Sequence, residues 1–225
     1  MLPNMPFLID VLLTGRIVPD FAKGRGDSAI AKRAVTGSRR VGLLGIEGDA
    51  QADLTVHGGR DKAIHHYPRD HYAGWASLIG AHALLRQAGA FGENISTLGM
   101  TEEAVCLGDR YRMGSALVEV AQGRQPCWKQ AHYLGEPKLV ALMVASGRTG
   151  WYYRVIEEGV VAAGNALVLE DRPCAEWPVA RLFALLIGGG HRGEGAALAE
   201  LAEHPLLAEE WRKRAKGLAG SARRR

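Results

Sequence analysis

Cysteine is scarce in this 225-residue chain, and long hydrophobic runs are missing. The three cysteines, Cys106, Cys127 and Cys174, are scattered and form no CxxC pair, which excludes a disulfide framework and is typical of a reducing compartment. No apolar run approaches the roughly 18 residues of a membrane span, and the first residues lack the features of a signal peptide. The sequence therefore predicts a cytoplasmic protein without a membrane-spanning segment.

A broad excess of positive charge is also missing. The 28 basic and 24 acidic residues give a net charge of +4, but residues 211–225 contain seven basic residues and no acidic one. The rest of the chain has 21 basic against 24 acidic residues, a net charge of −3. Because nucleic-acid binding needs an extended basic surface, stable nucleic-acid binding is not expected. The basic end either attracts an acidic partner or is simply solvated.

Glycine, in contrast, is abundant, with 29 residues, and it divides the first three quarters of the chain into short apolar runs. Such runs predict strands at residues 9–13, 29–35, 104–107, 116–121 and 166–169. Residues 108–114 are expected to form a turn between two antiparallel strands. Many short strands separated by glycine favour a β-barrel.

Helical periodicity interrupts this pattern at residues 68–79, where Pro68 suits a first helical position, and at residues 139–145. Three further helices are expected at residues 177–187, 195–203 and 206–218. The predicted organisation is a mainly β domain with helical insertions at residues 7–172, a small three-helix domain at 173–220 and a disordered basic tail at 221–225.

The first segment with candidate chemistry is rich in acids, histidine and glycine and spans residues 48–62. Gly58 and Gly59 would let the main chain approach a ligand, and the cations of Arg60 and Lys62 would neutralise an anion. A turn with surface charges is the alternative. Four histidines in and after this segment, His57, His65, His66 and His71, lack the spacing of a zinc motif.

The second segment places Cys127 after a proline and between the cations of Arg124 and Lys129. Because nearby cations stabilise a thiolate, Cys127 is a candidate nucleophile or soft-metal ligand, although a purely structural cysteine remains the alternative. A third, weaker segment contains Glu93 and Asn94 at a predicted strand edge, where Asn94 would serve equally well as a turn residue.

These segments, in this order, resemble the MOSC family, the domain named for the carboxy-terminal part of molybdenum cofactor sulfurase, and in particular its bacterial YiiM-type branch. The resemblance covers about residues 7–170 and is carried by Ser28 to Lys32, Gly48, Asp49, Asp53, His57-Gly58-Gly59, His66-Tyr67-Pro68, Gly92-Glu93-Asn94-Ile95, Pro126-Cys127 and Lys129. The three predicted C-terminal helices resemble the helical domain that follows MOSC in that branch.

The resemblance implies a MOSC-type β-barrel that binds the molybdenum cofactor, a pterin dithiolene with a phosphate. It implies that Cys127 ligates molybdenum. Since an imidazole titrates near neutral pH, we further expect His57 or Asp53 to relay protons near the metal. The remaining cofactor contacts are expected from polar and cationic residues and from the glycine pair: Ser28, Lys32, Gly58, Gly59, Arg60, Asn94, Arg124 and Lys129.

The implied activity is reduction of N-hydroxylated compounds, such as hydroxylaminopurine-type bases and amidoximes, to amines. Since the sequence has no ferredoxin cysteine cluster or flavin fingerprint, a separate flavoprotein reductase is expected to donate electrons. One alternative is a carrier of the cofactor or of sulfur without reductase activity. Another is a cysteine hydrolase or transferase using Cys127 with His132. The family relation also suggests pyridoxal phosphate as a ligand, for which Lys129 or Lys32 would be the candidate lysine.

Overall fold

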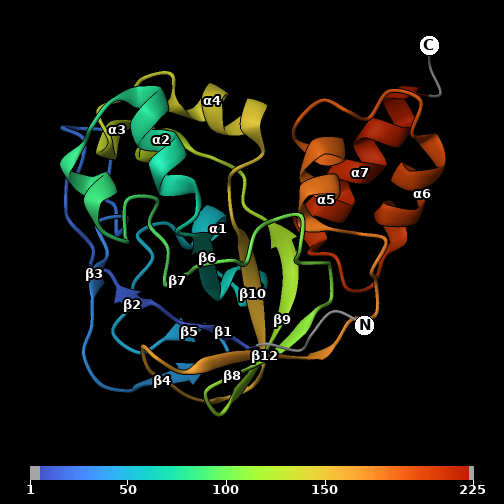
Figure 1. Ribbon diagram of the computed structural model, residues 1–225. Helices are drawn as coiled ribbons and strands as arrows, with labels where there is room; N and C mark the ends of the chain where they lie inside the picture. Colours follow the sequence, from blue (N-terminus) through green and yellow to red (C-terminus); the bar gives the residue numbers. More distant parts are fainter. Residues whose placement is uncertain (1–5, 223–225) are drawn as a thin grey trace.

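The structure, a computed structural model, describes residues 6–222 and consists of a strand-rich part with three helices beside it (Figure 1). The larger sheet has nine strands, in the order β1 (Phe7–Leu8), β12 (Ala166–Asp171), β8 (Arg110–Met113), β9 (Ala116–Gly123), β10 (Trp151–Glu157), β6 (Ile64–Pro68), β7 (Ile95–Thr97), β2 (Val11–Thr14) and β3 (Arg33–Ala34). The smaller sheet has three strands, in the order β11 (Gly159–Val161), β4 (Arg39–Gly42) and β5 (Gly45–Ile46).

The larger sheet is mixed and curled. Its neighbouring strands are antiparallel except for β6 and β7, which are parallel. Only Ile9 and Asp10 separate β1 from β2, although these strands stand first and eighth in the sheet order, so the sheet must curl back toward its own edge. Within residues 6–222 no ladder joins the edge strands β1 and β3. The expected barrel is therefore confirmed only as a curled, sheet-rich fold with helices.

Apolar side chains fill the inside of the curl. Leu12, Ile64, Val118, Trp151 and Leu167 come from five different strands, and each is fully buried in one cluster. Burying such side chains is the main favourable contribution to folding. Three helices cover one end of the sheet with an aromatic cluster of their own: α2 (His71–Ile79), α3 (Trp128–Tyr133) and α4 (Leu139–Ser146) (Figure 1).

Two sequence predictions about this sheet are wrong. Residues 104–107 form no strand of the sheet. Cys106 makes only an isolated bridge with Pro178, and its backbone N donates to the buried Asp109 carboxylate at 2.9 Å, which pairs with Arg172 at 2.7 Å. Residues 108–114 are not a turn, because β8 lies inside them and alternates between half-buried arginines and the buried Tyr111 and Met113. The turn that joins β8 to β9 is shorter and passes through Gly114, whose φ is 60°.

Two other predicted elements have different bounds. The strand expected at residues 29–35 is reduced to β3, and the helix expected from residue 68 begins at His71, because Pro68 is the last residue of β6. The helix predicted at 139–145 is confirmed as α4. Short helical turns complete the strand-rich part: α1 (Leu54–His57), η1 (Arg60–Lys62) and η2 (Ala83–Arg86).

The last part of the chain folds into α5 (Val179–Leu186), α6 (Gly195–Glu203) and α7 (Glu209–Ala222), close to the predicted ranges. These helices enclose an apolar cluster that includes Trp177, Leu198 and Trp211. Because α7 continues through residues 221 and 222, this part of the expected disordered tail is helical, while residues 223–225 lie outside the described residues. Among the described helices, none has the length and hydrophobicity needed to span a membrane.

Candidate functional site

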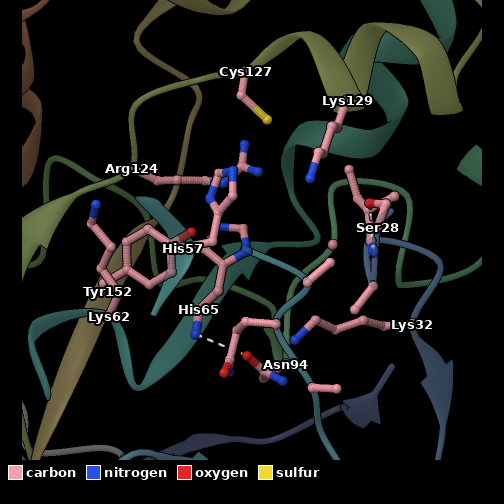
Figure 2. Close-up of a pocket in the computed structure, with 16 residues that line it drawn as sticks. Ser28, Lys32, His57, Lys62, His65, Asn94, Arg124, Cys127, Lys129 and Tyr152 are labelled. Atoms are coloured by element: carbon pink, nitrogen blue, oxygen red, sulfur yellow. Dashed lines mark hydrogen bonds between the residues drawn. The ribbon is translucent and has the colours of Figure 1, made fainter. Parts of the chain in front are cut away.

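A cavity opens where the end of β9, the start of α3 and the segment before β3 meet (Figure 2). Seven of the residues predicted for the site line it: Ser28, Lys32, His57, Asn94, Arg124, Cys127 and Lys129. Residues that are as much as 101 positions apart in the sequence, counted from Ser28 to Lys129, thus meet at one place.

Cys127 is held in a defined position at the start of α3. Its Sγ accepts a hydrogen bond from the backbone of Gln130, whose side-chain Oε1 accepts one from Cys127 N at 3.2 Å. The amide nitrogen of Gln130 in turn donates to Phe91 O at 3.3 Å, which ties the start of the helix to the loop before β7. Figure 2 shows the thiol pointing from the edge of the cavity toward its interior.

The surroundings of Cys127 favour the thiolate. Burial alone would raise the pKa of the thiol, but a hydrogen bond with His57 and the positive charge of Arg124 outweigh it and lower the pKa to about 6. Burial raises the pKa of Cys106 to about 11 and also raises that of Cys174. Cys127 is therefore the cysteine that carries negative charge at neutral pH.

This difference predicts a pH profile for thiol alkylation. The alkylation rate of Cys127 by iodoacetamide should rise with a midpoint near pH 6, because only the thiolate reacts and the thiolate is lost as the pH falls through the lowered pKa. His57→Gln should move the midpoint upward by about one unit. The midpoint is measured by mass spectrometry of protein labelled for fixed times. An unchanged profile in His57→Gln would remove His57 as the partner of the thiol.

Arg124 and His65 contribute buried polar atoms that lack well-formed hydrogen bonds. Arg124 is 5% exposed, and its Nε and Nη1 atoms have no hydrogen-bond acceptor. His65 is 3% exposed and neither ring nitrogen makes a hydrogen bond of good geometry, since its contacts with the backbone of Gly92 and Thr149 are weak. Burial and the charge of Arg124 keep its pKa well below the usual value. Since buried polar groups are nearly always paired in native proteins, a cation and a neutral imidazole without well-formed hydrogen bonds on a cavity wall indicate a binding site for a polar or anionic ligand.

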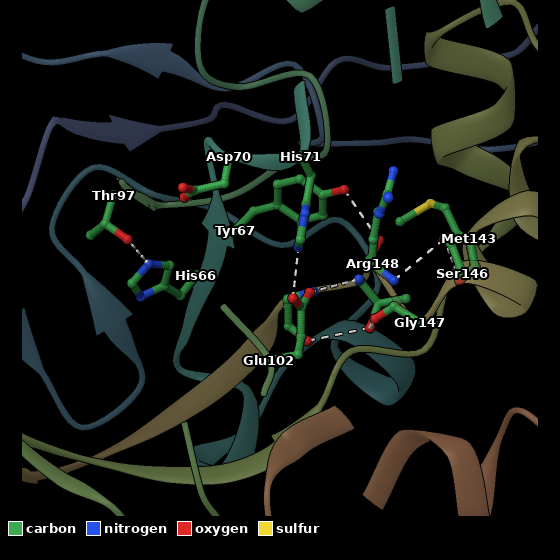
Figure 3. Close-up of polar contacts among 12 residues, drawn as sticks. His66, Tyr67, Asp70, His71, Thr97, Glu102, Met143, Ser146, Gly147 and Arg148 are labelled. Atoms are coloured by element: carbon green, nitrogen blue, oxygen red, sulfur yellow. Dashed lines mark hydrogen bonds and ion pairs between the residues drawn. The ribbon is translucent and has the colours of Figure 1, made fainter. Parts of the chain in front are cut away.

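A buried carboxylate, Glu102, holds the loop that leads into β10 (Figure 3). Glu102 is 2% exposed and accepts hydrogen bonds from the backbone of Thr149 at 2.9 Å and of Gly150 at 2.7 Å. Its other oxygen lies 2.7 Å from His71 Nε2. Because Gly150 O accepts the backbone hydrogen bond of Arg124 at 3.0 Å, this network places Arg124 relative to the sheet.

Among the predicted cofactor-binding residues, Lys129 Nζ donates to Asp27 O at 2.8 Å, and Lys32 and Asn94 also have partners within the protein. Lys32 Nζ is 2.5 Å from Asp49 Oδ2, and burial lowers the pKa of this lysine. Asn94 accepts a hydrogen bond from His65 N at 3.1 Å and donates one to Leu13 O at 3.2 Å, so it ties β6 to β2. Lys32 and Asn94 both line the cavity, but these contacts within the protein indicate that they stabilise its wall.

Four predicted site residues do not line the cavity: Asp53, Gly58, Gly59 and Arg60. Asp53 caps α1 by accepting hydrogen bonds from Thr55 N and Thr55 Oγ1, at 3.0 and 2.6 Å, and these bonds lower its pKa. A carboxylate with a lowered pKa is a poor proton relay at neutral pH, so its position does not support the catalytic role predicted for it. Arg60 instead lines a shallow neighbouring groove.

The cavity also contains His65, Tyr152 and Gln51, which were not among the predicted site residues. His65 and Tyr152 face each other with ring centroids 5.1 Å apart, and Lys62, the cation predicted to neutralise an anion, completes the wall with Gln51. The signal for His65 was its position in the buried strand β6, where a polar residue needs a reason to be present. The imidazole beside the Cys127 thiol is His57, whereas His132 packs against the ring of Phe21 at 5.3 Å.

Comparison with known proteins agrees with the resemblance noted in the sequence. The model of the MOSC domain family matches residues 53–168. Protein YiiM of Escherichia coli is 45% identical over 168 residues, which are 75% of this chain and 74% of that protein. The crystal structure of YiiM from Geobacillus stearothermophilus superposes with a TM-score of 0.79 at 34% identity and covers 95% of this chain and 100% of the other.

A third relative is longer. The protein named Reductase from Gibberella moniliformis is 36% identical over 166 residues, which are 73% of this chain but only 29% of that protein. The family match, the identity to YiiM and the superposition over nearly the whole chain all point the same way. The chain belongs to the MOSC domain family.

Proposed function

We propose that this protein binds the molybdenum cofactor through Cys127 and reduces N-hydroxylated compounds to amines. The observation that carries the proposal is the pairing, in one cavity, of a thiolate with buried donors that lack well-formed hydrogen bonds, Arg124 and His65. The similarity to the relative named Reductase supports an oxidoreductase. The MOSC family supplies the link to this particular cofactor.

The donors present fit such a group. A thiolate with a pKa near 6 is a soft ligand that suits a transition metal. The free guanidinium atoms of Arg124 and the ring nitrogens of His65 suit the polar edge and negative charge of a pterin phosphate. Ser28 Oγ accepts a hydrogen bond from Ile30 N at 3.2 Å, which leaves its O–H as a donor toward the cavity.

The side chains of this protein would bind the cofactor, orient it and give a proton to the substrate. Cys127 would ligate the metal from the start of α3, and Arg124 would hold negative charge beside it. His57, which hydrogen-bonds the thiol, is the group placed to give a proton to the oxygen that leaves an N–OH substrate. When bound, the cofactor would supply the two-electron chemistry and accept the oxygen, which no side chain can do.

The electrons would come from a separate flavoprotein reductase. Three arginines, Arg16, Arg33 and Arg39, line a groove that contains one acid, Glu47. The groove lies on the other side of the same segment as the cavity, since Ala31 and Arg33 line the groove and the alternating Ile30 and Lys32 line the cavity. Only the segment of residues 30–33 would separate an acidic donor docked there from the cavity. Positive charge of this kind speeds the association of an acidic partner.

Charge reversal at the groove tests this docking. Arg33→Glu should lower turnover driven by a flavoprotein reductase about tenfold at low ionic strength and much less at high ionic strength, because salt screens exposed charges. The same change at an exposed arginine far along the chain, Arg192→Glu, should have little effect. Turnover driven by dithionite-reduced viologen should be equal in all three proteins. A salt-independent loss in Arg33→Glu would place the donor elsewhere.

The proposed function is tested on protein purified from a host that makes the cofactor. Molybdenum and released pterin should each be found at about one per chain, and 6-hydroxylaminopurine should be converted to adenine with reduced viologen as the donor. Protein with neither molybdenum nor pterin would refute the proposal. Stoichiometric cofactor without turnover, and with rapid exchange of the cofactor, would favour a carrier.

A further inference from the structure

The beginning of α7 touches the sheet directly behind the cavity. Ala208, just before the helix, donates its backbone hydrogen bond to Ala121 O in β9 at 3.0 Å. Figure 1 shows α5 and α7 standing beside the end of β9, the strand that leads to Arg124 and Cys127. The C-terminal helices thus contact the main sheet where the site is built.

Trp211, in the first turn of α7, lies against the last residue of β9. A Cβ atom placed on Gly123 would be 2.9 Å from Cη2 of the Trp211 ring and 3.4 Å from a methyl group of Val179 in α5. Gly123 does not have a positive φ, so its backbone conformation is open to any residue, and only space requires glycine. The 1%-exposed indole therefore fixes how the chain passes through Gly123 into Arg124.

The same turn of α7 makes a second contact with the cavity wall. Glu210, next to Trp211, lies 2.5 Å from Lys62 Nζ, and Lys62 lines the cavity from η1. The lysine side chain is 13% exposed, which gives the ion pair more weight than a fully solvated one. Two adjacent residues of one helix therefore contact two parts of the site wall: Trp211 lies against Gly123, the neighbour of Arg124, and Glu210 pairs with Lys62.

We propose that the first turn of α7 is a positioning element of the site: Trp211 sets the place of Arg124 through Gly123, and Glu210 holds Lys62. This gives the C-terminal helices a role beyond stability. The inference deepens the proposed function and rests on it for its consequence, because it concerns the charges around the proposed ligand Cys127. The geometry of the cavity wall can be tested without any cofactor.

The test compares two reagents on full-length protein made in a host without the cofactor. Iodoacetate is an anion and iodoacetamide is neutral, so the ratio of their rates with Cys127 at one pH reports the positive charge that the cavity presents. Gly123→Ala pushes against the indole and should lower this ratio about threefold as Arg124 is displaced. The matched control is Gly217→Ala in α7, the helix of Trp211, where an added Cβ meets no atom within 4 Å.

Making room for the new Cβ at residue 123 should return Arg124 to its place and restore the positive charge of the cavity. In the double variant Gly123→Ala with Trp211→Phe, the smaller ring leaves room for the new Cβ, and the ratio should return toward that of the wild type. A role limited to stability predicts a different result: the melting temperature falls in Gly123→Ala while the ratio stays as in Gly217→Ala. That result would overturn the inference for Trp211.

The contact with Lys62 is tested by two isosteric variants in the first turn of α7. Glu210→Gln should change the iodoacetate-to-iodoacetamide ratio about twofold, because the carboxylate beside Lys62 is lost. Glu209→Gln is the matched control, since it removes the same charge from the same turn at a residue that pairs with Lys213 on the outer face. Equal ratios in these two variants would refute the role of Glu210. Neither experiment depends on molybdenum, so a protein that binds no cofactor leaves this inference testable on its own.

Discussion

Replacing Cys127 with serine is expected to remove the bound molybdenum and to abolish reduction of N-hydroxylated compounds. A serine hydroxyl stays protonated at neutral pH and is a hard donor, so it cannot replace a thiolate with a pKa near 6 as a ligand. The affinity for molybdenum should fall at least about 100-fold, which is the upper end of the loss caused by changing residues that only support a metal ligand. Elemental analysis of protein purified from a cofactor-making host measures the loss.

Cys174→Ser is the matched control for this substitution. Cys174 is buried, has a raised pKa and lies 3.6 Å from His204, so a hydroxyl finds a hydrogen-bond partner there. The control should retain molybdenum and turnover. If Cys127→Ser retains the metal at the level of the control, then Cys127 is not the ligand, and its thiolate must serve another chemistry in the cavity.

The sequence was informative where the chemistry is local. The thiolate character of Cys127 could be predicted because Arg124 is only three residues away on the same segment, and the structure shows that this guanidinium does lower the thiol pKa. The three C-terminal helices could be predicted because each has its own apolar periodicity and is bounded by glycine or proline. The strand β9 could be predicted for a similar reason, since most of its residues are apolar and it is buried along its whole length.

The sequence was misleading where a side chain's direction is decided by distant residues. Asp53, His57 and Arg60 belong to one motif, but α1 uses Asp53 as its cap and turns only His57 toward the thiol. The strand β8 was missed because its arginines look like turn residues until Glu119 and Glu170 pair with them. No local pattern could place Trp211 behind Gly123, since this contact depends on how α7 packs on the sheet.

Removing the charge of Arg124 should make the cofactor-free protein more stable. The guanidinium is 5% exposed with two nitrogens unpartnered, and such burial of charge is unfavourable unless a ligand compensates it. Arg124→Met keeps most of the volume and should raise the free energy of unfolding by about 1–3 kcal/mol, while retention of molybdenum is lost. Urea unfolding of the two cofactor-free proteins measures the difference. As a control, Arg16→Met at an exposed position should change stability by less than about 0.5 kcal/mol.

The gain in stability should also depend on pH, with a sign that follows from the thiol. Above pH 6 the Cys127 thiolate partly compensates Arg124, and below pH 6 protonation of the thiol removes this negative charge. The stabilisation by Arg124→Met should therefore be larger at pH 5 than at pH 8. If Arg124→Met destabilises the protein at both values, Arg124 contributes to folding rather than to binding. If Arg124→Met is more stable than the cofactor-free wild type but not more stable than the wild type with bound cofactor, the native protein keeps an unfavourable buried charge in order to bind its ligand.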